Sequence, residues 1–233
     1  MKPLKNPSEL KVSLPTGAAT TALVYSSTAQ AGAALILGHG AGAGQRSTFM
    51  VDFARALSAL GVDTITFNFL YTEQGRKIPD RGPALEACYL SVIDGVRSEV
   101  ESARRSLFIG GKSMGGRIAS QVGAANPELA LNGLVFLGYP LHPPGKPTER
   151  RDKHLPAIAR PMLFVQGTRD AFGTPQELEP ILAPLQPPPL LHVVANGDHS
   201  FKLSRKDPAA QAAVYADIQR AIVDFIDTTL AVR

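Results

Sequence analysis

The sequence is poor in cysteine and in aromatic residues, and it contains no tryptophan. Cys88 is the only cysteine among 233 residues, which excludes an internal disulfide framework and a zinc site made of thiolates alone. Aromatic residues make up 6% of the chain, so a platform on which nucleic-acid bases stack is disfavoured. These absences favour a protein that is held together by its apolar core.

Long runs of one kind of residue are also missing. The chain has 24 basic and 20 acidic residues, a net charge of +4, and its basic residues are scattered, so we expect no nucleic-acid partner. The longest apolar stretches, such as residues 33–37, are too short to cross a bilayer, and residues 1–7 lack the apolar segment of a signal peptide. We expect a cytoplasmic protein without a membrane partner, either a monomer or a homodimer.

Short apolar segments alternate along the chain with longer segments of helical periodicity. Continuous apolar runs of this kind are typical of strands in a parallel sheet that is covered on both faces. The alternation predicts an α/β protein with a doubly wound, mostly parallel sheet of about six to eight strands and helices on both faces. Strands are predicted at 33–37, 63–69, 106–109, 133–137, 162–165 and 190–194, with an antiparallel edge strand at 21–25. Helices are predicted at 47–60, 83–103, 113–125, 175–185 and 208–230.

The length suits one domain, which we expect to span residues 1–233. Residues 1–19 precede the first predicted strand and are interpreted as an N-terminal extension. Residues 139–161 form a loop that is crowded with prolines, near the expected active site. This loop is too short for a cap of several helices, so the fold is expected to have a minimal cap or none.

The strongest local motif is G-x-S-x-G, which reads Gly111-Lys112-Ser113-Met114-Gly115. It follows a predicted strand and opens a predicted helix, and this context places a nucleophilic serine on a sharp strand-to-helix turn. Small neighbours are needed there because the strand and the helix approach closely. The alternative interpretation is an ordinary glycine-rich turn.

A nucleophilic serine needs a base and a residue that orients the base. Asp170 follows one predicted strand and His199 follows the last one, so the chain order is serine, acid, histidine. All three residues therefore lie at the carboxyl edge of the sheet, where open α/β sheets carry their active sites. Alternatively, Asp170 is only a turn former and His199 only a residue of a surface loop.

The oxyanion hole is predicted to combine the backbone N–H groups of Met114 and Ala41. Ala41 belongs to the glycine-rich loop 38–44, and His39 is expected to bond within this loop and shape it. No metal-binding motif and no complete nucleotide-binding motif occurs, so we expect neither a metal nor a cofactor. The residues considered for the pocket lining are His39, Gly40, Tyr71, Tyr139 and Leu141.

Three stretches together resemble a known family. They are Gly-Gly-Lys-Ser-Met-Gly-Gly-Arg at 110–117, Leu-Gly-His-Gly-Ala-Gly at 37–42 and Gly-Tyr-Pro-Leu-His-Pro-Pro-Gly-Lys-Pro at 138–147. The chain resembles dienelactone-hydrolase-like α/β-hydrolases and, more narrowly, bacterial relatives of the testis-expressed and NSL-complex-subunit α/β-hydrolase-like domains. The resemblance implies Ser113, Asp170 and His199 as a catalytic triad. True dienelactone hydrolases use a cysteine where Ser113 stands, so dienelactone chemistry itself is not expected.

The residues and the resemblance together predict a serine hydrolase that cleaves a small ester or thioester through an acyl-enzyme. A non-catalytic interaction module that kept the fold is the alternative, and a serine peptidase or amidase is a further one. Several cations lie near the expected mouth of the site and suggest an anionic substrate, although they equally fit a solvated surface. They are Lys112, Arg81, Lys146, Arg150 and Arg151.

Overall fold

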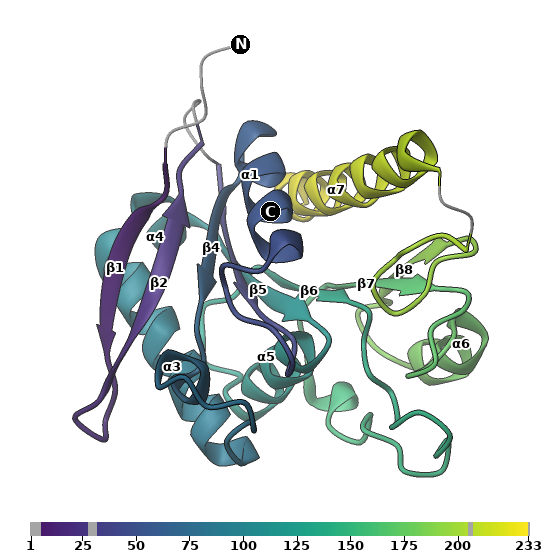
Figure 1. Cartoon of the computed structure of the whole chain (residues 1–233), viewed down its shortest axis with the longest axis horizontal. Helices are drawn as coiled ribbons and strands as arrows, with labels where there is room; N and C mark the ends of the chain where they lie inside the picture. Colours follow the sequence, from purple (N-terminus) through teal and green to yellow (C-terminus); the bar gives the residue numbers. More distant parts are fainter. Residues whose placement is uncertain (1–5, 28–31, 205–206, 233) are drawn as a thin grey trace.

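An eight-stranded sheet runs through the centre of the protein, with helices on both faces (Figure 1). The computed structural model describes residues 6–27, 32–204 and 207–232. The strand order is β1-β2-β4-β3-β5-β6-β7-β8, with β1 and β2 antiparallel to their neighbours and the other strands parallel. The strands are β1 (Ser8–Ser13), β2 (Ala19–Tyr25), β3 (Ala34–Gly38), β4 (Asp63–Phe67), β5 (Leu107–Lys112), β6 (Gly133–Leu137), β7 (Met162–Gly167) and β8 (Leu190–Val194).

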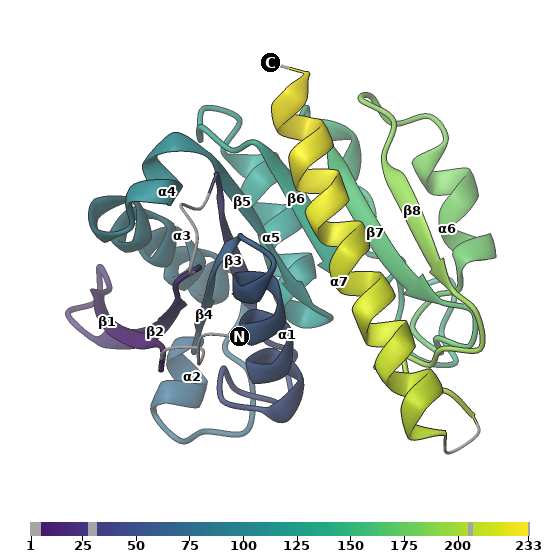
Figure 2. The same cartoon turned by 90° about the horizontal axis from the view of Figure 1, so that it is seen from above.

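The helices form one layer on each face of the sheet. Figures 1 and 2 show α1 (Thr48–Ala59) and α7 (Pro208–Ala231) on one face. The opposite face carries α3 (Gly82–Glu99), α4 (Glu101–Arg105), α5 (Met114–Ala125) and α6 (Pro175–Leu182). Two short helices, α2 (Leu70–Glu73) and the 3₁₀ helix η1 (Leu155–Ala157), lie in connections. No helix in the described part of the chain is both long and apolar enough to cross a membrane.

The apolar core is split by the sheet into two layers. Along β3, Ala34 and Ile36 pack in the layer under α3 and α5, whereas Leu35 and Leu37 pack in the layer under α1 and α7. Successive side chains of a strand point to opposite faces, so a strand covered on both faces must be apolar throughout. The predicted doubly wound, mostly parallel sheet is therefore confirmed.

The structure differs from the sequence prediction at the N-terminal edge of the sheet. Residues 8–13, interpreted above as part of an extension, form the edge strand β1, and β2 lies between β1 and β4 instead of at the edge. β1 is mostly exposed and buries only Val12, so its sequence lacks the continuous apolar run of an inner strand. Residues 1–5 of the predicted extension lie outside the described residues. The predicted helix 83–103 is divided at Val100, which has extended backbone angles.

The strand order reverses direction at β3, since β4 lies on one side of it and β5 on the other. Connections that leave a sheet in opposite directions open a crevice at the carboxyl edge of the strands. The loops that follow β3, β5, β6, β7 and β8 all begin at this edge, because these strands are parallel. The fold therefore gathers five loops around one crevice.

Candidate active site

Ser113 occupies a strained turn between β5 and α5. Its φ of 52° and ψ of −116° lie in a region that residues with a side chain rarely adopt. The turn packs tightly on the end of β3, because a Cβ atom on Gly111 or on Gly115 would lie 2.3 or 2.1 Å from the carbonyl oxygen of Gly38. Glycine at these two positions lets the strand and the helix meet, and the serine hydroxyl is presented at the carboxyl edge.

The structure brings the three predicted residues together in one hydrogen-bonded chain. The His199 Nε2 atom lies 2.8 Å from the Ser113 Oγ, and its Nδ1 atom lies 2.8 Å from the Asp170 Oδ2. The Asp170 side chain is fully buried, whereas that of His199 is 21% exposed. With the Nδ1–H donated to the carboxylate, Nε2 is left to accept the serine proton. This arrangement equips Ser113 for nucleophilic attack.

Gln166 and Phe172, which were not predicted from the sequence, hold Asp170 and His199 in place. The Gln166 side-chain amide donates to the Asp170 Oδ2 at 2.9 Å, and its Oε1 accepts the N–H of Tyr139 at 2.9 Å. Phe172 donates its N–H to the Asp170 Oδ1 at 2.8 Å, and its ring lies 4.2 Å from the His199 ring. The signal for Gln166 was available, because an amide inside an apolar strand must find buried partners.

The two residues of the predicted oxyanion hole lie at the same cavity as Ser113. Ala41 and Met114 both line it, and neither amide has an acceptor within the described part of the chain. Gly40 brings the loop close, since a Cβ atom built on it would lie 3.6 Å from the Ser113 Cβ. Met114 is also the first residue of α5, where free N–H groups and the helix dipole favour negative charge.

His39 is buried and bonds inside the loop that it was predicted to shape. Its Nδ1 donates to the carbonyl oxygen of Gly40 at 2.8 Å, and its Nε2 accepts the N–H of Phe69 at 3.2 Å. Burial lowers the pKa of the imidazole, which keeps it neutral. The Tyr71 hydroxyl donates to the carbonyl oxygen of Ala41 at 2.9 Å. Both side chains fix the loop that carries the Ala41 amide.

The cavity at the carboxyl edge has a volume of about 640 Å³. Its walls come from loop 40–43, the start of α1, the segment that leads into α3, the Ser113 turn and the loops after β6, β7 and β8. Of the residues considered for the lining, Gly40 is part of it. His39, Tyr71, Tyr139 and Leu141 lie behind it, each at most 2% exposed. The His39 ring and the hydroxyl groups of Tyr71 and Tyr139 bond to backbone carbonyl groups of loops. Leu141 packs in the apolar core.

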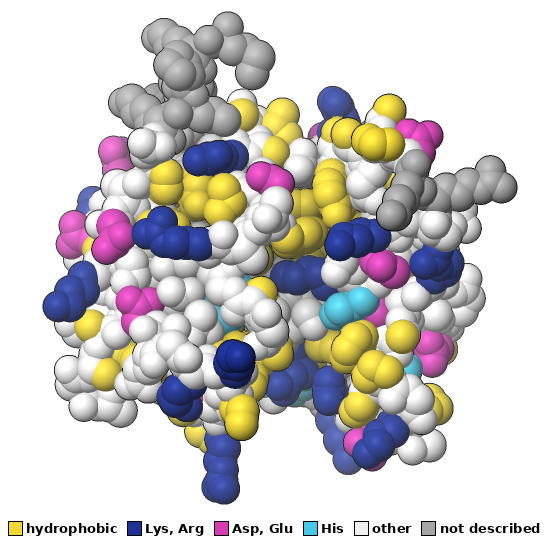
Figure 3. All heavy atoms as spheres, in the orientation of Figure 1, with side chains coloured by type: hydrophobic (Ala, Val, Ile, Leu, Met, Phe, Trp, Pro, Cys, Tyr) yellow, Lys and Arg dark blue, Asp and Glu magenta, His cyan; other side chains and the backbone are white. Residues whose placement is uncertain are grey.

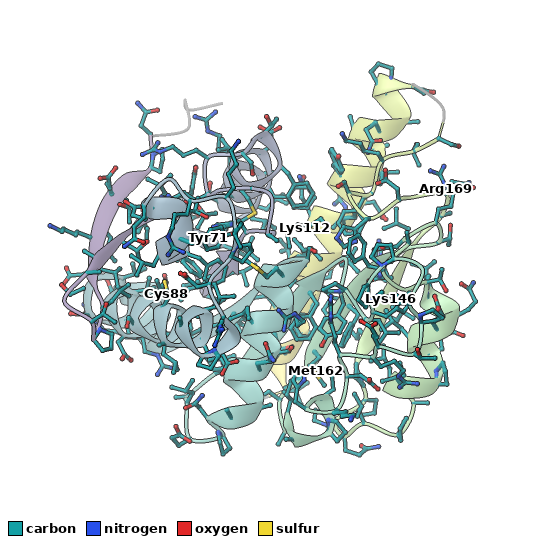
Figure 4. All side chains as sticks on the ribbon, turned by 60° about the horizontal axis from the view of Figure 1, so that its bottom comes forward. Tyr71, Cys88, Lys112, Lys146, Met162 and Arg169 are labelled. Carbon is teal, nitrogen blue, oxygen red and sulfur yellow. The ribbon has the colours of Figure 1, made fainter. Side chains whose placement is uncertain are left out.

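Lys112 is buried at the end of β5, directly before the nucleophile. It is 8% exposed, and no acceptor for its Nζ exists among the described residues. Burial lowers the pKa of this ammonium to about 8, although the nearby carboxylates of Asp170 and Asp198 oppose the shift. Figure 4 shows Lys112 in the middle of the molecule. A Cβ atom on Gly138, which has a φ of +63°, would lie 2.9 Å from the ammonium.

The cations expected at the mouth of the site are only partly found there. Lys112 and Arg151 line the cavity, whereas Arg81, Lys146 and Arg150 do not. Arg117 lines it as well and was not expected. Its signal was its position four residues after Ser113, which puts both side chains on one face of the helix that begins there.

The lone cysteine lies away from this chemistry. Cys88 is on α3, only 2% exposed, and burial raises the pKa of its thiol to about 11. A thiol with this pKa stays protonated near neutral pH and is a poor nucleophile. Within the described residues, no group of three or more His, Cys, Asp or Glu side chains is arranged to hold a metal ion.

Comparison with other proteins agrees with the fold. The family model described as "Alpha/beta hydrolase domain" matches residues 31–227. An α/β serine hydrolase homologue from Coxiella burnetii is similar in structure, with a TM-score of 0.72 and 16% identity over 96% of this chain and 99% of that chain. Dienelactone hydrolase from Anabaena variabilis is similar with a TM-score of 0.71 and 19% identity, over 95% of this chain and 100% of that one.

A third similar structure is an α/β serine hydrolase without a lid from Xanthomonas campestris. It has a TM-score of 0.68 and 22% identity, over 94% of this chain and 97% of that chain. At these identities the solved structures show a shared, dienelactone-hydrolase-like fold. The narrower resemblance to the testis-expressed and NSL-complex-subunit relatives stays a prediction. From the family model and the fold together, the chain belongs to the α/β-hydrolase superfamily.

Proposed function

We propose that this α/β hydrolase cleaves a small carboxylic ester or thioester through an acyl-enzyme on Ser113. The observation that carries the proposal is the chain of two 2.8 Å hydrogen bonds from Ser113 through His199 to Asp170. In this proposal Ser113 is the nucleophile, His199 the general base and acid, and Asp170 the residue that orients the imidazole.

The reaction has two halves. As the Ser113 Oγ attacks the carbonyl carbon, its proton passes to the His199 Nε2, and Asp170 stabilises the imidazolium. The tetrahedral intermediate then collapses, and the imidazolium protonates the leaving alcohol or thiol. A water molecule repeats the sequence on the acyl-enzyme, with His199 again as the base, and releases the carboxylic acid.

The N–H groups of Ala41 and Met114 stabilise the oxyanion in both halves of the reaction. Each donor of this kind is worth about 2.7–4 kcal/mol of the barrier. Because both groups lack an acceptor within the described part of the chain, they donate to the substrate without breaking a bond inside the protein. Tyr71 and His39 keep the Ala41 amide in place through the bonds described above.

The size of the cavity supports a small substrate. Its volume of about 640 Å³ lies in the range of sites for small molecules. Between β6 and β7, the described chain forms turns and the three-residue helix η1 instead of a helical cap. A short acyl group and a small leaving group therefore fit this site better than a long chain.

The substitution Ser113→Ala tests the proposal. The purified protein is assayed with 4-nitrophenyl acetate and butyrate, with an acyl thioester, and with a fluorophosphonate probe followed by mass spectrometry. We expect Ser113→Ala to lose roughly 10³-fold or more in kcat and all labelling, because the nucleophile is absent. Ser91→Ala changes a partly buried serine of α3 that does not line the cavity; it is the matched control and retains both. A wild-type protein that neither cleaves any ester nor reacts with the probe contradicts the proposal and favours a non-catalytic module.

A further inference from the structure

The cavity beside the nucleophile carries an excess of positive charge. Lys112, Arg117 and Arg151 line it, against one carboxylate, that of Asp80, which is already paired with Arg76 at 2.7 Å. Figure 3 shows Lys and Arg side chains gathered along the hollow in the middle of this face. A cavity with this balance attracts anions, and its low dielectric strengthens the attraction.

Arg117 is held in the cavity wall without a carboxylate partner. It is half-buried on the first turn of α5, and its Nη1 donates to the side-chain oxygen of Gln121 at 3.1 Å. This hydrogen bond to the neutral Gln121 amide fixes the Arg117 side chain but does not neutralise the charge of its guanidinium. No carboxylate lies within 4 Å of this guanidinium in the described part of the chain; the field of Glu86 reaches it from α3 without an ion pair.

Arg151 reaches the same cavity from the proline-rich loop. Its backbone is anchored on both sides, because its N–H donates to the Leu141 carbonyl at 2.8 Å and its carbonyl accepts the Tyr139 hydroxyl at 2.7 Å. Its guanidinium has no acceptor among the residues that the structure describes. The neighbouring Arg150 is different, since it is exposed and paired with Asp152.

Arg117 and Arg151 line the same cavity, and the charge of Arg151 acts on Arg117. Burial is the main cause that lowers the pKa of Arg117, and the charge of Arg151 lowers it further, whereas Tyr139 and Glu86 act in the opposite direction. Two like charges that face one cavity are stabilised when an anion lies between them. The planar, forked donors of arginine match a carboxylate, which accepts two parallel hydrogen bonds from each.

We propose that Arg117 and Arg151 together bind a carboxylate of the substrate, so that the preferred esters carry a second, ionised carboxyl group. The inference rests on the proposed function and names the substrate class for that site. Arg117 follows Ser113 by four residues, a rise of about 6 Å along the helix. Because Ser113, Arg117 and Arg151 line one cavity of about 640 Å³, the matching substrate is small, such as the half-ester of a short dicarboxylic acid.

Matched esters test this specificity. One is 4-nitrophenyl hydrogen glutarate, which is an anion, and the other is its methyl ester, which is neutral. We expect the wild-type kcat/KM to favour the anion, and Arg117→Gln and Arg151→Gln each to reduce the ratio of anion to neutral ester by about tenfold or more. Arg150→Gln removes the same charge from the exposed neighbour and is expected to keep the ratio. A ratio that is unchanged in both cavity variants overturns the proposal.

Binding of glutarate separates this proposal from the hydrolase proposal. Calorimetry on Ser113→Ala measures the affinity without turnover, and adding Arg117→Gln or Arg151→Gln is expected to raise the Kd by about tenfold or more. If no ester is cleaved but glutarate binding depends on both arginines, the carboxylate site stands and the hydrolase proposal fails. If neutral esters are cleaved and glutarate does not bind, the carboxylate site is refuted and the hydrolase stands. Arg117→Lys and circular dichroism show whether a loss is due to charge or to misfolding.

Discussion

Replacing Lys112 by methionine is expected to stabilise the protein at neutral pH. The ammonium of Lys112 is buried next to Ser113 with no acceptor among the described residues, and the Phe201 ring centroid is 5.6 Å away. Methionine has a similar length and no charge, and its sulfur packs well against an aromatic ring. The substitution removes the cost of burying the charge while it keeps the volume.

The size of the effect follows from the pKa of this lysine. Burial lowers it from the ordinary 10.5 to about 8, and each tenfold change in acidity corresponds to about 1.36 kcal/mol. The ammonium of Lys112 therefore destabilises the native state by about 3 kcal/mol at pH 7. For a chain of this length, removing a destabilisation of this size is expected to raise Tm by about 6–12 °C.

The same reasoning gives the sign of the pH dependence. Below pH 8 both states keep the proton on Lys112, and the native state bears the full cost. Between pH 8 and 10.5 the native state has lost the proton while the unfolded chain still binds it, so wild-type stability gains from this group as the pH rises. The advantage of Lys112→Met should therefore shrink over this interval and vanish above it.

Thermal unfolding of the wild type and of Lys112→Met, at pH 7 and at pH 10, measures both effects. Lys153→Met is the matched control, because Lys153 is exposed, and its Tm is expected to differ little from the wild type at either pH. A Lys112→Met protein that is no more stable than the wild type at pH 7, or that is stabilised equally at both pH values, refutes the reasoning.

Two further substitutions test the geometry of the site. Asp170→Asn should lower kcat by about 10⁴-fold with little change in fold, because the amide no longer fixes the imidazole tautomer; a steady-state ester assay measures it, and near-normal kcat would contradict the role given to this carboxylate. Gly115→Ala should destabilise the protein by about 3 kcal/mol or more in denaturant unfolding, because its Cβ would lie 2.1 Å from the Gly38 carbonyl oxygen. Gly42→Ala is the matched control, since a Cβ there has no atom within 4 Å, and equal losses in the two variants would count against the close approach.

The inner sheet could be predicted from the sequence because its strands are apolar throughout. Residues 33–37 and 133–137 carry no polar side chain, and both are buried strands of the sheet. β1 was not predicted, because an edge strand buries one face and its Ser-Glu-Leu-Lys-Val-Ser sequence is mostly polar. A continuous apolar run therefore identifies strands that are buried on both faces of the sheet and misses an edge strand that is buried on one face.

The residues of the proposed triad could be identified because each lies within five residues after the end of a strand. The roles of Gln166 and Arg117 could not be derived in the same way, since they depend on which side chains from distant segments meet. Gln166 bonds to Asp170 four residues later and also to Tyr139 from another strand's loop. The predicted lining failed for Tyr139 for the same reason: nearness to the site in the chain does not say whether a side chain faces the cavity or supports its wall.

Several energetically unfavourable features lie close to Ser113. Ser113 has a positive φ, the Lys112 ammonium is buried without a hydrogen-bond acceptor among the described residues, and the charge of Arg151 acts on Arg117 in the same cavity. In the two core layers, by contrast, apolar side chains of the covered strands pack against the helices. Local rules are broken mainly where a site needs them broken, and the surrounding packing must then hold the strained groups in place. The strained turn at Ser113 presents its hydroxyl group to the cavity. In the carboxylate-binding proposal, the charges of Arg117 and Arg151 are neutralised when an anion binds. Under the two proposals above, the cavity of the free protein is complementary to a ligand that carries both an ester carbonyl and a carboxylate.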